Sequence, residues 1–188
     1  MVIFVKNMVC DRCITSVKQQ LLSLHFDVNK IGLGSVDVSP EPTIDQLQDI
    51  SSALKILGFE VLDKQKDQLI DQIKTQIIEL VHYSDLSILN ESLLVMIADR
   101  LNRDYAYLSR LFSDSEGITI EKYIIHQKIE KVKELLEYGA LSLKEISYKM
   151  GYSSSAHLST QFKLITGLSP SKFISSGLMK RKPLDQLD

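Results

Sequence analysis

One pattern of residues occurs twice in this chain, at positions fifty residues apart. The first copy is Leu108-x3-Phe112-x4-Gly117-x-Thr119-x3-Tyr123, and the second is Leu158-x3-Phe162-x4-Gly167-x-Ser169-x3-Phe173. Leucine and phenylalanine four residues apart lie on the same face of a helix, glycine favours the end of that helix, and a hydroxyl residue suits the cap of the next one. Each copy therefore predicts a helix, a glycine stop and a second helix.

A short apolar helix is expected before each copy. Its apolar positions are Leu94, Ile97, Ala98 and Leu101 in the first case and Leu143, Ile146 and Met150 in the second. Because only a few residues separate each pair of helices, the sequence predicts two helix-turn-helix units. Motifs of this kind that bind DNA do so through their second helix. The alternative is a pair of duplicated helical hairpins that serve stability alone.

The second unit has the sharper local signals. Ser142 and Glu145 have the spacing of a capping box, Gly151 permits a left-handed stop, and the serines at 153–155 offer caps for the next helix. The buried face of that helix is expected to hold Leu158, Phe162 and Ile165.

The opposite face of this helix is polar and suits DNA. It carries short donors and acceptors with a cation, namely Ser154, Ser155, His157, Thr160, Gln161 and Lys163. The matching helix of the first unit is expected to expose Tyr105, Ala106, Ser109 and Arg110, with Arg103 just before it. Such groups contact base edges and phosphates in a major groove. Arg110 is the best single candidate, because a guanidinium can bridge O6 and N7 of guanine.

A single long helix is predicted between the two units. Residues 120–138 contain no glycine or proline, and Ile125, Ile129, Val132 and Leu136 recur at helical spacing before Gly139. At about 1.5 Å per residue this helix is about 28 Å long. Successive major-groove openings on one side of B-DNA lie about 34 Å apart, so the helix suits two units bound to one duplex.

Three segments carry a family resemblance: Ile146-x3-Met150-Gly151-Tyr152-Ser153, His157-Leu158-Ser159-x-Gln161-Phe162-Lys163 and Thr166-Gly167-Leu168-Ser169-Pro170-x2-Phe173. They are similar to the C-terminal signature of the AraC/XylS family of bacterial transcription regulators, whose DNA-binding domain the last part of the chain resembles. The resemblance implies two helix-turn-helix subdomains joined by a linking helix, and a protein that is not an enzyme. By position it implies base contacts by Ala106, Arg110, Ser155, Ala156 and Thr160. After Phe112 the family commonly has lysines, where this chain has Ser113-Asp114-Ser115-Glu116.

Two cysteines follow a predicted strand at the amino terminus. The strand is Val2-Ile3-Phe4-Val5, and Asn7-Met8-Val9-Cys10-Asp11-Arg12-Cys13 then leads into a helix with Val17, Leu21, Leu22 and Leu24 on its apolar stripe. Backbone donors and the helix dipole at such a turn are expected to lower a thiol pKa, and thiolate is the form that binds metal. No second Cys-x-x-Cys completes a zinc site, so two sulfurs favour a softer ion such as monovalent copper.

The order of elements around the cysteines predicts a ferredoxin-like βαββαβ domain. After the first strand and helix come strands at 28–33 and 36–38, a helix at 44–57 and a strand at 59–62. With Met8, Cys10, Cys13 and Gly58-Phe59, residues 1–62 resemble the heavy-metal-associated domain of copper chaperones and copper ATPases. The resemblance implies a site for monovalent copper or another thiophilic ion at Cys10 and Cys13. Met8 is expected to be a buried support, and Asn7 stands where that family has glycine.

Two alternatives stay open for the cysteines. A Cys-x-x-Cys pair can serve thiol redox chemistry, although the nine residues before Cys10 leave no room for the strand and helix that precede a thioredoxin site. Two buried thiols can also be purely structural. Two alternatives also stay open for the whole chain. It is a metal carrier or thiol redox protein whose helical half is a docking module, or it is a regulator whose N-terminal domain is a dimerisation or protein-interaction module without metal.

Two small domains are expected, because 188 residues with 44% hydrophobic composition can bury two modest cores. The expected order is an α+β domain at 1–62, a polar linker at 63–68, and an all-α domain at 69–188 in which residues 92–176 bind DNA. No membrane span or signal peptide is predicted, and the sparse cysteines fit the cytoplasm.

The formal net charge of −2 predicts few phosphate contacts. Glu130, Glu134 and Glu137 are expected to face away from DNA on the linking helix, while Arg103, Arg110, Lys163 and the tail Lys180-Arg181-Lys182 lie near it. Modest affinity of a monomer then predicts a homodimer or paired sites. The expected partners are double-stranded DNA, bound in the major groove, and RNA polymerase.

Overall fold

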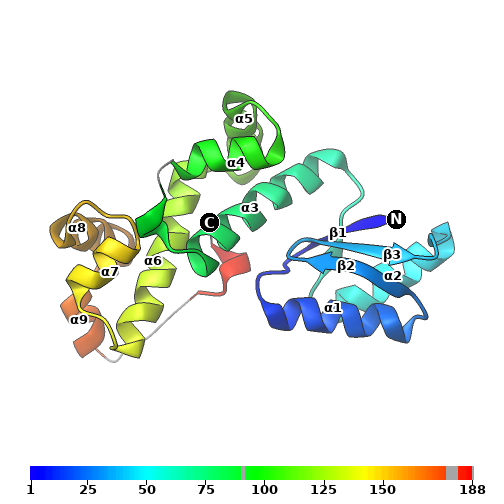
Figure 1. The fold of residues 1–188 in the computed structure, drawn as a ribbon, viewed down its shortest axis with the longest axis horizontal. Coiled ribbons are helices and arrows are strands. Elements are labelled where there is room, and N and C mark those ends of the chain that lie inside the picture. Colours follow the sequence, from blue (N-terminus) through cyan, green and yellow to red (C-terminus); the bar gives the residue numbers. More distant parts are fainter. Residues whose placement is uncertain (90–91, 177–181, 188) are drawn as a thin grey trace. The chain divides into compact units, whose positions relative to one another are not determined.

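The computed structural model describes residues 1–89, 92–176 and 182–187, and the chain divides into two compact units, Met1–Thr75 and Gln76–Asp188 (Figure 1). The division lies inside helix α3 (Gln65–Tyr83), downstream of the linker expected at 63–68. This helix begins at Gln65, within the segment that the sequence predicts as a linker. The Gln68 side chain donates a hydrogen bond of 2.7 Å to the carbonyl of Leu62, which ties the first turn of the helix to the preceding strand. Along the described residues, no helix combines the length and the apolar character that crossing a bilayer requires.

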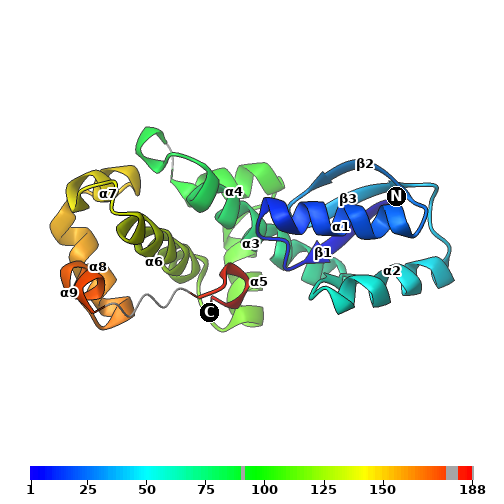
Figure 2. The same cartoon turned by 90° about the horizontal axis from the view of Figure 1, so that it is seen from below.

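The N-terminal unit is a small antiparallel sheet with two helices against one face (Figures 1 and 2). Its elements are β1 (Val2–Lys6), α1 (Asp11–Ser23), β2 (Asp27–Gly32), β3 (Ser35–Ser39), α2 (Ile44–Ile56) and β4 (Glu60–Val61). The strand order is β2-β3-β1-β4, and β1 is antiparallel to both of its neighbours. The β2–β3 hairpin turns at Gly34, whose φ is +78° and where an added Cβ would lie 2.8 Å from the Thr75 hydroxyl. That turn requires glycine.

The core of this unit follows from alternation along the strands and from helical spacing. Every second residue of β1 and β3 faces the helices, and the fully packed positions are Ile3, Val5, Val36 and Val38 from the sheet with Val17, Leu21, Ile50 and Leu54 from the helices. Leu22, which was expected on the apolar stripe of α1, is instead 48% exposed. Val17 and Leu21 are four residues apart and define the inner face, so the next residue turns toward solvent.

The C-terminal unit is helical. After α3 it contains η1 (Leu86–Ile88), α4 (Leu93–Leu101), α5 (Tyr105–Glu116), α6 (Ile120–Tyr138), α7 (Leu143–Lys149), α8 (Ser155–Thr166), α9 (Pro170–Ser175) and η2 (Leu184–Gln186). Helix α6 has the bounds that the sequence predicts, because Thr119 caps its start and Gly139, with φ of +65°, ends it. It contacts α5, α7, α8 and α9 and so joins the two helix-turn-helix units (Figure 2).

Glu130 and Glu134, which the sequence predicts to face away from DNA, form ion pairs within α6. Glu130 is 3% exposed and pairs with Lys133, and its other carboxylate oxygen accepts the Lys182 backbone N–H at 3.1 Å. Glu134 pairs with Lys131 at 2.6 Å. Buried charges are commonly paired in this way. A buried carboxylate oxygen of Glu137, by contrast, has no hydrogen-bond partner among the described residues.

Candidate nucleic-acid interface

The second helix of each helix-turn-helix unit begins at a side-chain cap. In the first unit, the Asp104 carboxylate accepts the backbone N–H of Tyr107 at 3.0 Å. In the second, the Ser154 hydroxyl accepts the backbone N–H of His157 at 3.1 Å. These equivalent bonds set the starts of α5 and α8. The oxygen of Ser154, predicted as a DNA contact, therefore has a structural partner already.

The glycine stops and the caps that follow them are confirmed in both units. Gly117 and Gly167 adopt the left-handed conformation, with φ of +71° and +77°. Two residues later, the hydroxyls of Thr119 and Ser169 each accept a backbone N–H at 3.3 Å and start the next helix. The repeat in the sequence is thus a repeat of backbone geometry.

Each unit is held by a leucine and a phenylalanine on the inner face of its second helix. The four side chains have no exposed surface, and they are Leu108, Phe112, Leu158 and Phe162. The ring of Phe162 lies 5.4 Å from that of Phe173, and the ring of Phe112 lies 5.5 Å from that of Tyr123. The expectation that Ile165 is buried is wrong, since it is 39% exposed. It lies in the last turn of α8, beyond the contact between the two phenylalanine rings.

The outer faces of α5 and α8 expose the same positions. The exposed residues among the first six of each helix are Ala106, Tyr107 and Arg110 on α5 and Ala156, His157 and Thr160 on α8. Of the other predicted DNA contacts, Arg103, Ser154 and Lys163 are exposed, whereas Tyr105 and Ser155 are half-buried. The two units therefore expose equivalent positions of their second helices, the helices that lie in the major groove in helix-turn-helix proteins.

Tyr105 lies differently from the other predicted contacts. Its hydroxyl donates a hydrogen bond to the Glu121 carboxylate in the first turn of α6. Burial has the largest effect in raising the pKa of Tyr105, and this hydrogen bond raises it further. Its proton is therefore directed at the linking helix and not at a groove. Tyr107, which the sequence interpretation missed, is 50% exposed at the position equivalent to His157. Aligning the two copies of the repeat would have identified it.

The short polar side chains of α8 are held in place without any ligand. The Thr160 hydroxyl donates to the carbonyl of Ala156 at 3.0 Å, which leaves its oxygen available as an acceptor. A ring nitrogen of His157, Nδ1, lies 3.1 Å from the Ser153 hydroxyl, and the ring packs edge-on against Tyr152 at 5.3 Å. Ordered side chains lose less conformational entropy on binding, which favours a specific contact.

Three cations lie on or beside the exposed faces. Arg110 and Lys163 extend from α5 and α8, and Arg103 lies in the turn before α5, where its guanidinium donates to the Asn102 carbonyl at 3.2 Å. Lys180 and Arg181 of the predicted basic tail lie outside the described residues. The small number of cations on these faces limits how many phosphates they could neutralise.

The two cysteines lie together at the start of α1. Cys10 is the cap residue of the helix, and its Sγ lies 3.3 Å from that of Cys13. This separation exceeds the roughly 2.05 Å of a disulfide bond, so both are free thiols. The expectation of a lowered thiol pKa is wrong for Cys13, because burial raises its pKa by more than the backbone hydrogen bonds lower it.

The backbone around the cysteines is shaped by Asn7 and Met8. Asn7 adopts φ of +72°, a conformation that favours glycine but that asparagine tolerates, and its side-chain amide donates to the Gly58 carbonyl at 3.0 Å. Met8 is 2% exposed, which confirms it as a buried support and leaves its sulfur inside the core. Within the described ranges, no group of three or more His, Cys, Asp or Glu side chains is placed to hold a metal ion. Two soft sulfurs without a third ligand fit a monovalent thiophilic ion better than zinc.

The C-terminal part of the chain is similar to known helix-turn-helix proteins. Residues 97–176 match a family model described as a helix-turn-helix domain. The Msm operon regulatory protein of Streptococcus mutans is 40% identical over 77 residues, which cover 41% of this chain and 28% of that protein. The HTH-type transcriptional activator RhaS of Escherichia coli is 30% identical over 74 residues, which cover 39% and 27%. The C-terminal domain of AraT, a response regulator from Geobacillus stearothermophilus, is 26% identical with a TM-score of 0.51, over 60% of this chain and 88% of that one. The chain thus spans little more than a quarter of the length of these two curated relatives.

Proposed function

We propose that this chain, whose C-terminal part is a helix-turn-helix DNA-binding domain of the AraC/XylS type, regulates transcription by binding specific DNA sequences through α5 and α8. The observation that carries the proposal is that the second, third and sixth residues are exposed in both of these helices. The regulatory proteins that it resembles are not enzymes, and no catalytic role is assigned. RNA polymerase and a second copy of the chain are the partners that such a function calls for.

The residues have different roles in this proposal. Arg110 hydrogen-bonds a guanine, and Thr160 accepts from a base edge, while Ala106 and Ala156 allow close approach to thymine methyl groups. Arg103 and Lys163 contact phosphates and position the helices without specifying sequence. Helix α6, about 28 Å long, supports the placement of α5 and α8 in successive major grooves.

Selection of bound fragments from the source genome tests this function. The full chain is expected to retain a small set of fragments against excess random DNA, with a shallow dependence of affinity on salt because few phosphates are neutralised. A protein that retains no fragment in preference to random competitor would contradict the proposal. A steep salt dependence of the monomer would contradict the assignment of few phosphate contacts.

We also propose that the N-terminal unit is a ferredoxin-like, heavy-metal-associated domain that binds one monovalent copper ion, or a similar thiophilic ion, through Cys10 and Cys13. The strand order β2-β3-β1-β4 and the two thiols 3.3 Å apart support this proposal. Because the pKa of Cys13 is raised, its thiol is protonated at neutral pH. Metal uptake therefore releases a proton, and metal affinity rises with pH until that pKa is passed.

The double variant Cys10→Ser/Cys13→Ser is expected to lose the bound copper, measured as metal per chain after equilibration with monovalent copper under reducing conditions. Met8→Leu is the matched control, since it removes a nearby sulfur that is buried away from solvent, and it should bind one ion like the parent chain. Equal copper content in all three proteins would exclude the cysteine site. The open alternatives would then be a protein-interaction module or a redox pair.

Metal responsiveness requires in addition that the DNA-bound and free forms differ in metal affinity. Fragment binding by the parent chain and by the double cysteine variant, each with and without copper, measures that difference. Equal occupancy in all four cases would exclude metal sensing and leave DNA binding intact.

A further inference from the structure

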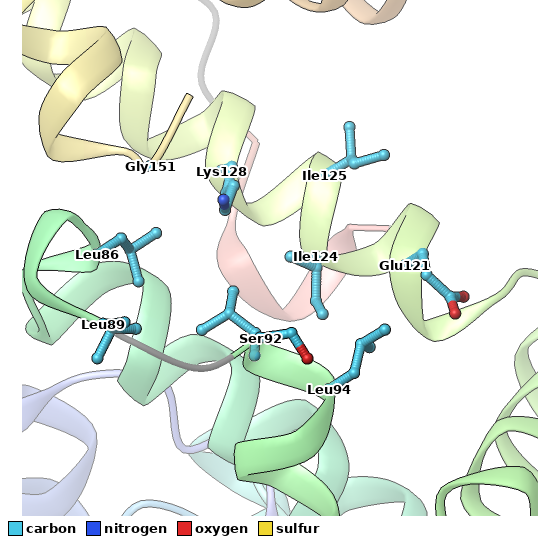
Figure 3. A pocket seen from close by; sticks show the side chains of 10 residues that line it. Leu86, Leu89, Ser92, Leu94, Glu121, Ile124, Ile125, Lys128 and Gly151 are labelled. Atoms are coloured by element: carbon cyan, nitrogen blue, oxygen red, sulfur yellow. The ribbon is translucent and has the colours of Figure 1, made fainter. Parts of the chain in front are cut away.

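A cavity of about 380 Å³ that is open to solvent lies in the C-terminal unit (Figure 3). Its wall is mostly aliphatic and comes from the η1 region, the start of α4 and the first half of α6; the main apolar residues are Leu86, Leu89, Leu94 and Ile124. The residues that line it are separate from the exposed faces of α5 and α8. Its volume falls within the range of about 300–1,000 Å³ that is typical of small-ligand sites.

Lys128 places an ammonium group at the wall of this cavity (Figure 3). Its Nζ donates to the carbonyl of Met150 at 3.0 Å and lies 5.3 Å from the centre of the Tyr152 ring. An ammonium has three N–H donors, and the Met150 carbonyl is the one acceptor found for it in the described part of the chain. Burial lowers the pKa of Lys128, as expected for a cation that has lost water without gaining full compensation.

The Tyr152 side chain next to this ammonium is also incompletely satisfied. Its hydroxyl is buried and has no hydrogen-bond partner among residues 1–89, 92–176 and 182–187. A buried polar group without a partner costs free energy. Tyr152 is not among the residues that line the cavity, so Lys128 is the group that a ligand there would meet.

Among the described residues, the other polar side chains at the cavity have partners of their own. The Glu121 carboxylate accepts a hydrogen bond from the Tyr105 hydroxyl, and the Ser92 hydroxyl accepts the backbone N–H of Val95 at 3.3 Å. Glu121 is seven residues before Lys128 on α6, or about 10 Å along the helix axis. Figure 3 shows it at the end of the cavity away from the Lys128 nitrogen. Repulsion of an anion by Glu121 is therefore weak at the Lys128 end.

We propose that this cavity binds a small monocarboxylate with an aliphatic body. The carboxylate accepts hydrogen bonds from the free donors of Lys128, and the hydrocarbon chain lies against Leu86, Leu89 and Ile124. A charge-assisted hydrogen bond in a largely apolar site is stronger than one in water, which favours an anion over a neutral molecule of the same shape. A cationic amphiphile is disfavoured by the same ammonium.

Calorimetric titration of the full chain with octanoate tests the site, with octylamine as a probe of equal chain length and opposite charge. Octanoate is expected to bind one per chain and about tenfold or more tightly than octylamine, the effect of one charge-assisted hydrogen bond. Lys128→Met should weaken octanoate binding about tenfold or more. Lys122→Met is the matched control, because it removes the same charge from an exposed position on the same helix and should leave the affinity unchanged.

Leu94→Trp tests the cavity itself with Lys128 intact. The larger indole ring fills the cavity and should abolish octanoate binding. If Lys128→Met does not fold, Leu94→Trp still tests the proposed site. Octanoate binding that survives in Leu94→Trp would overturn the proposal, as would equal affinities in Lys128→Met and Lys122→Met or equal binding of octanoate and octylamine. None of these outcomes depends on whether the chain binds DNA.

Discussion

Phe162→Ala is expected to lower the free energy of unfolding of the C-terminal unit by about 3–5 kcal/mol. The Phe162 side chain has no exposed surface, and its ring packs edge-on against Phe173 at 5.4 Å. Truncation removes buried apolar area, opens a cavity between α8 and α9, and loses an aromatic pair. Because most domains are stable by only about 5–15 kcal/mol, this loss is a large fraction of the total.

Urea denaturation followed by far-ultraviolet circular dichroism measures the effect. Leu164→Ala is the control on the same helix, since Leu164 is 80% exposed and its truncation should change the free energy of unfolding by less than about 0.5 kcal/mol. Phe112→Ala, at the equivalent position of the first unit, should cost as much as Phe162→Ala. A cost for Phe162→Ala no larger than that of Leu164→Ala would refute the packing of the second unit.

Arg110→Ala is expected to weaken binding to the selected DNA by about 1–3 kcal/mol and to relax sequence preference at one base pair. Arg110 is exposed on the outer face of α5, at the position equivalent to Thr160 on α8. A guanidinium that bridges O6 and N7 of guanine supplies a contact that other base pairs cannot reproduce. Electrophoretic mobility shift with single-base variants of a selected fragment measures both the affinity and the lost preference.

Two further variants separate base contact from charge. Lys18→Ala removes an exposed cation from α1 in the N-terminal unit, outside the cysteine loop, and we expect it to leave DNA affinity unchanged. Arg103→Ala should weaken binding equally for all sequences and reduce the salt slope by about one, the behaviour of a phosphate contact. If Arg110→Ala weakens binding to selected and random DNA by the same factor, then Arg110 contacts phosphate and not a base.

The parts of the fold that could be predicted are those specified by neighbouring residues. Helix α6 has the predicted bounds, and the caps at Ser142 and Ser154 and the stops at Gly117 and Gly167 are where the sequence places them. Caps and left-handed stops depend on side chains within three or four residues of the helix end. Such signals can be recognised without knowledge of the rest of the chain. The exposed face of α8 could also be predicted from the residues of that helix alone.

The predictions that were wrong concern the burial of side chains and the partners that they contact. Leu22 and Ile165 have helical spacing suited to burial and are exposed, while Glu130 looks like a surface residue and is buried beside Lys133. Tyr105 is directed at Glu121 on the next helix rather than outward. Burial and partners of these residues depend on elements that are distant in the chain or set at an angle, which periodicity cannot reveal.

The sequence by itself determined the duplicated helix-turn-helix pattern, the long linking helix and the pairing of the two thiols with a helix start, because each of these depends on interactions within a few residues. Only the tertiary structure decided that Lys128 lies beside an aliphatic cavity, that burial raises the pKa of Cys13, and that Glu130 is buried and paired with Lys133. Solvation and the partners of charged groups are set by all the elements that surround them. They therefore become known only once those elements are packed.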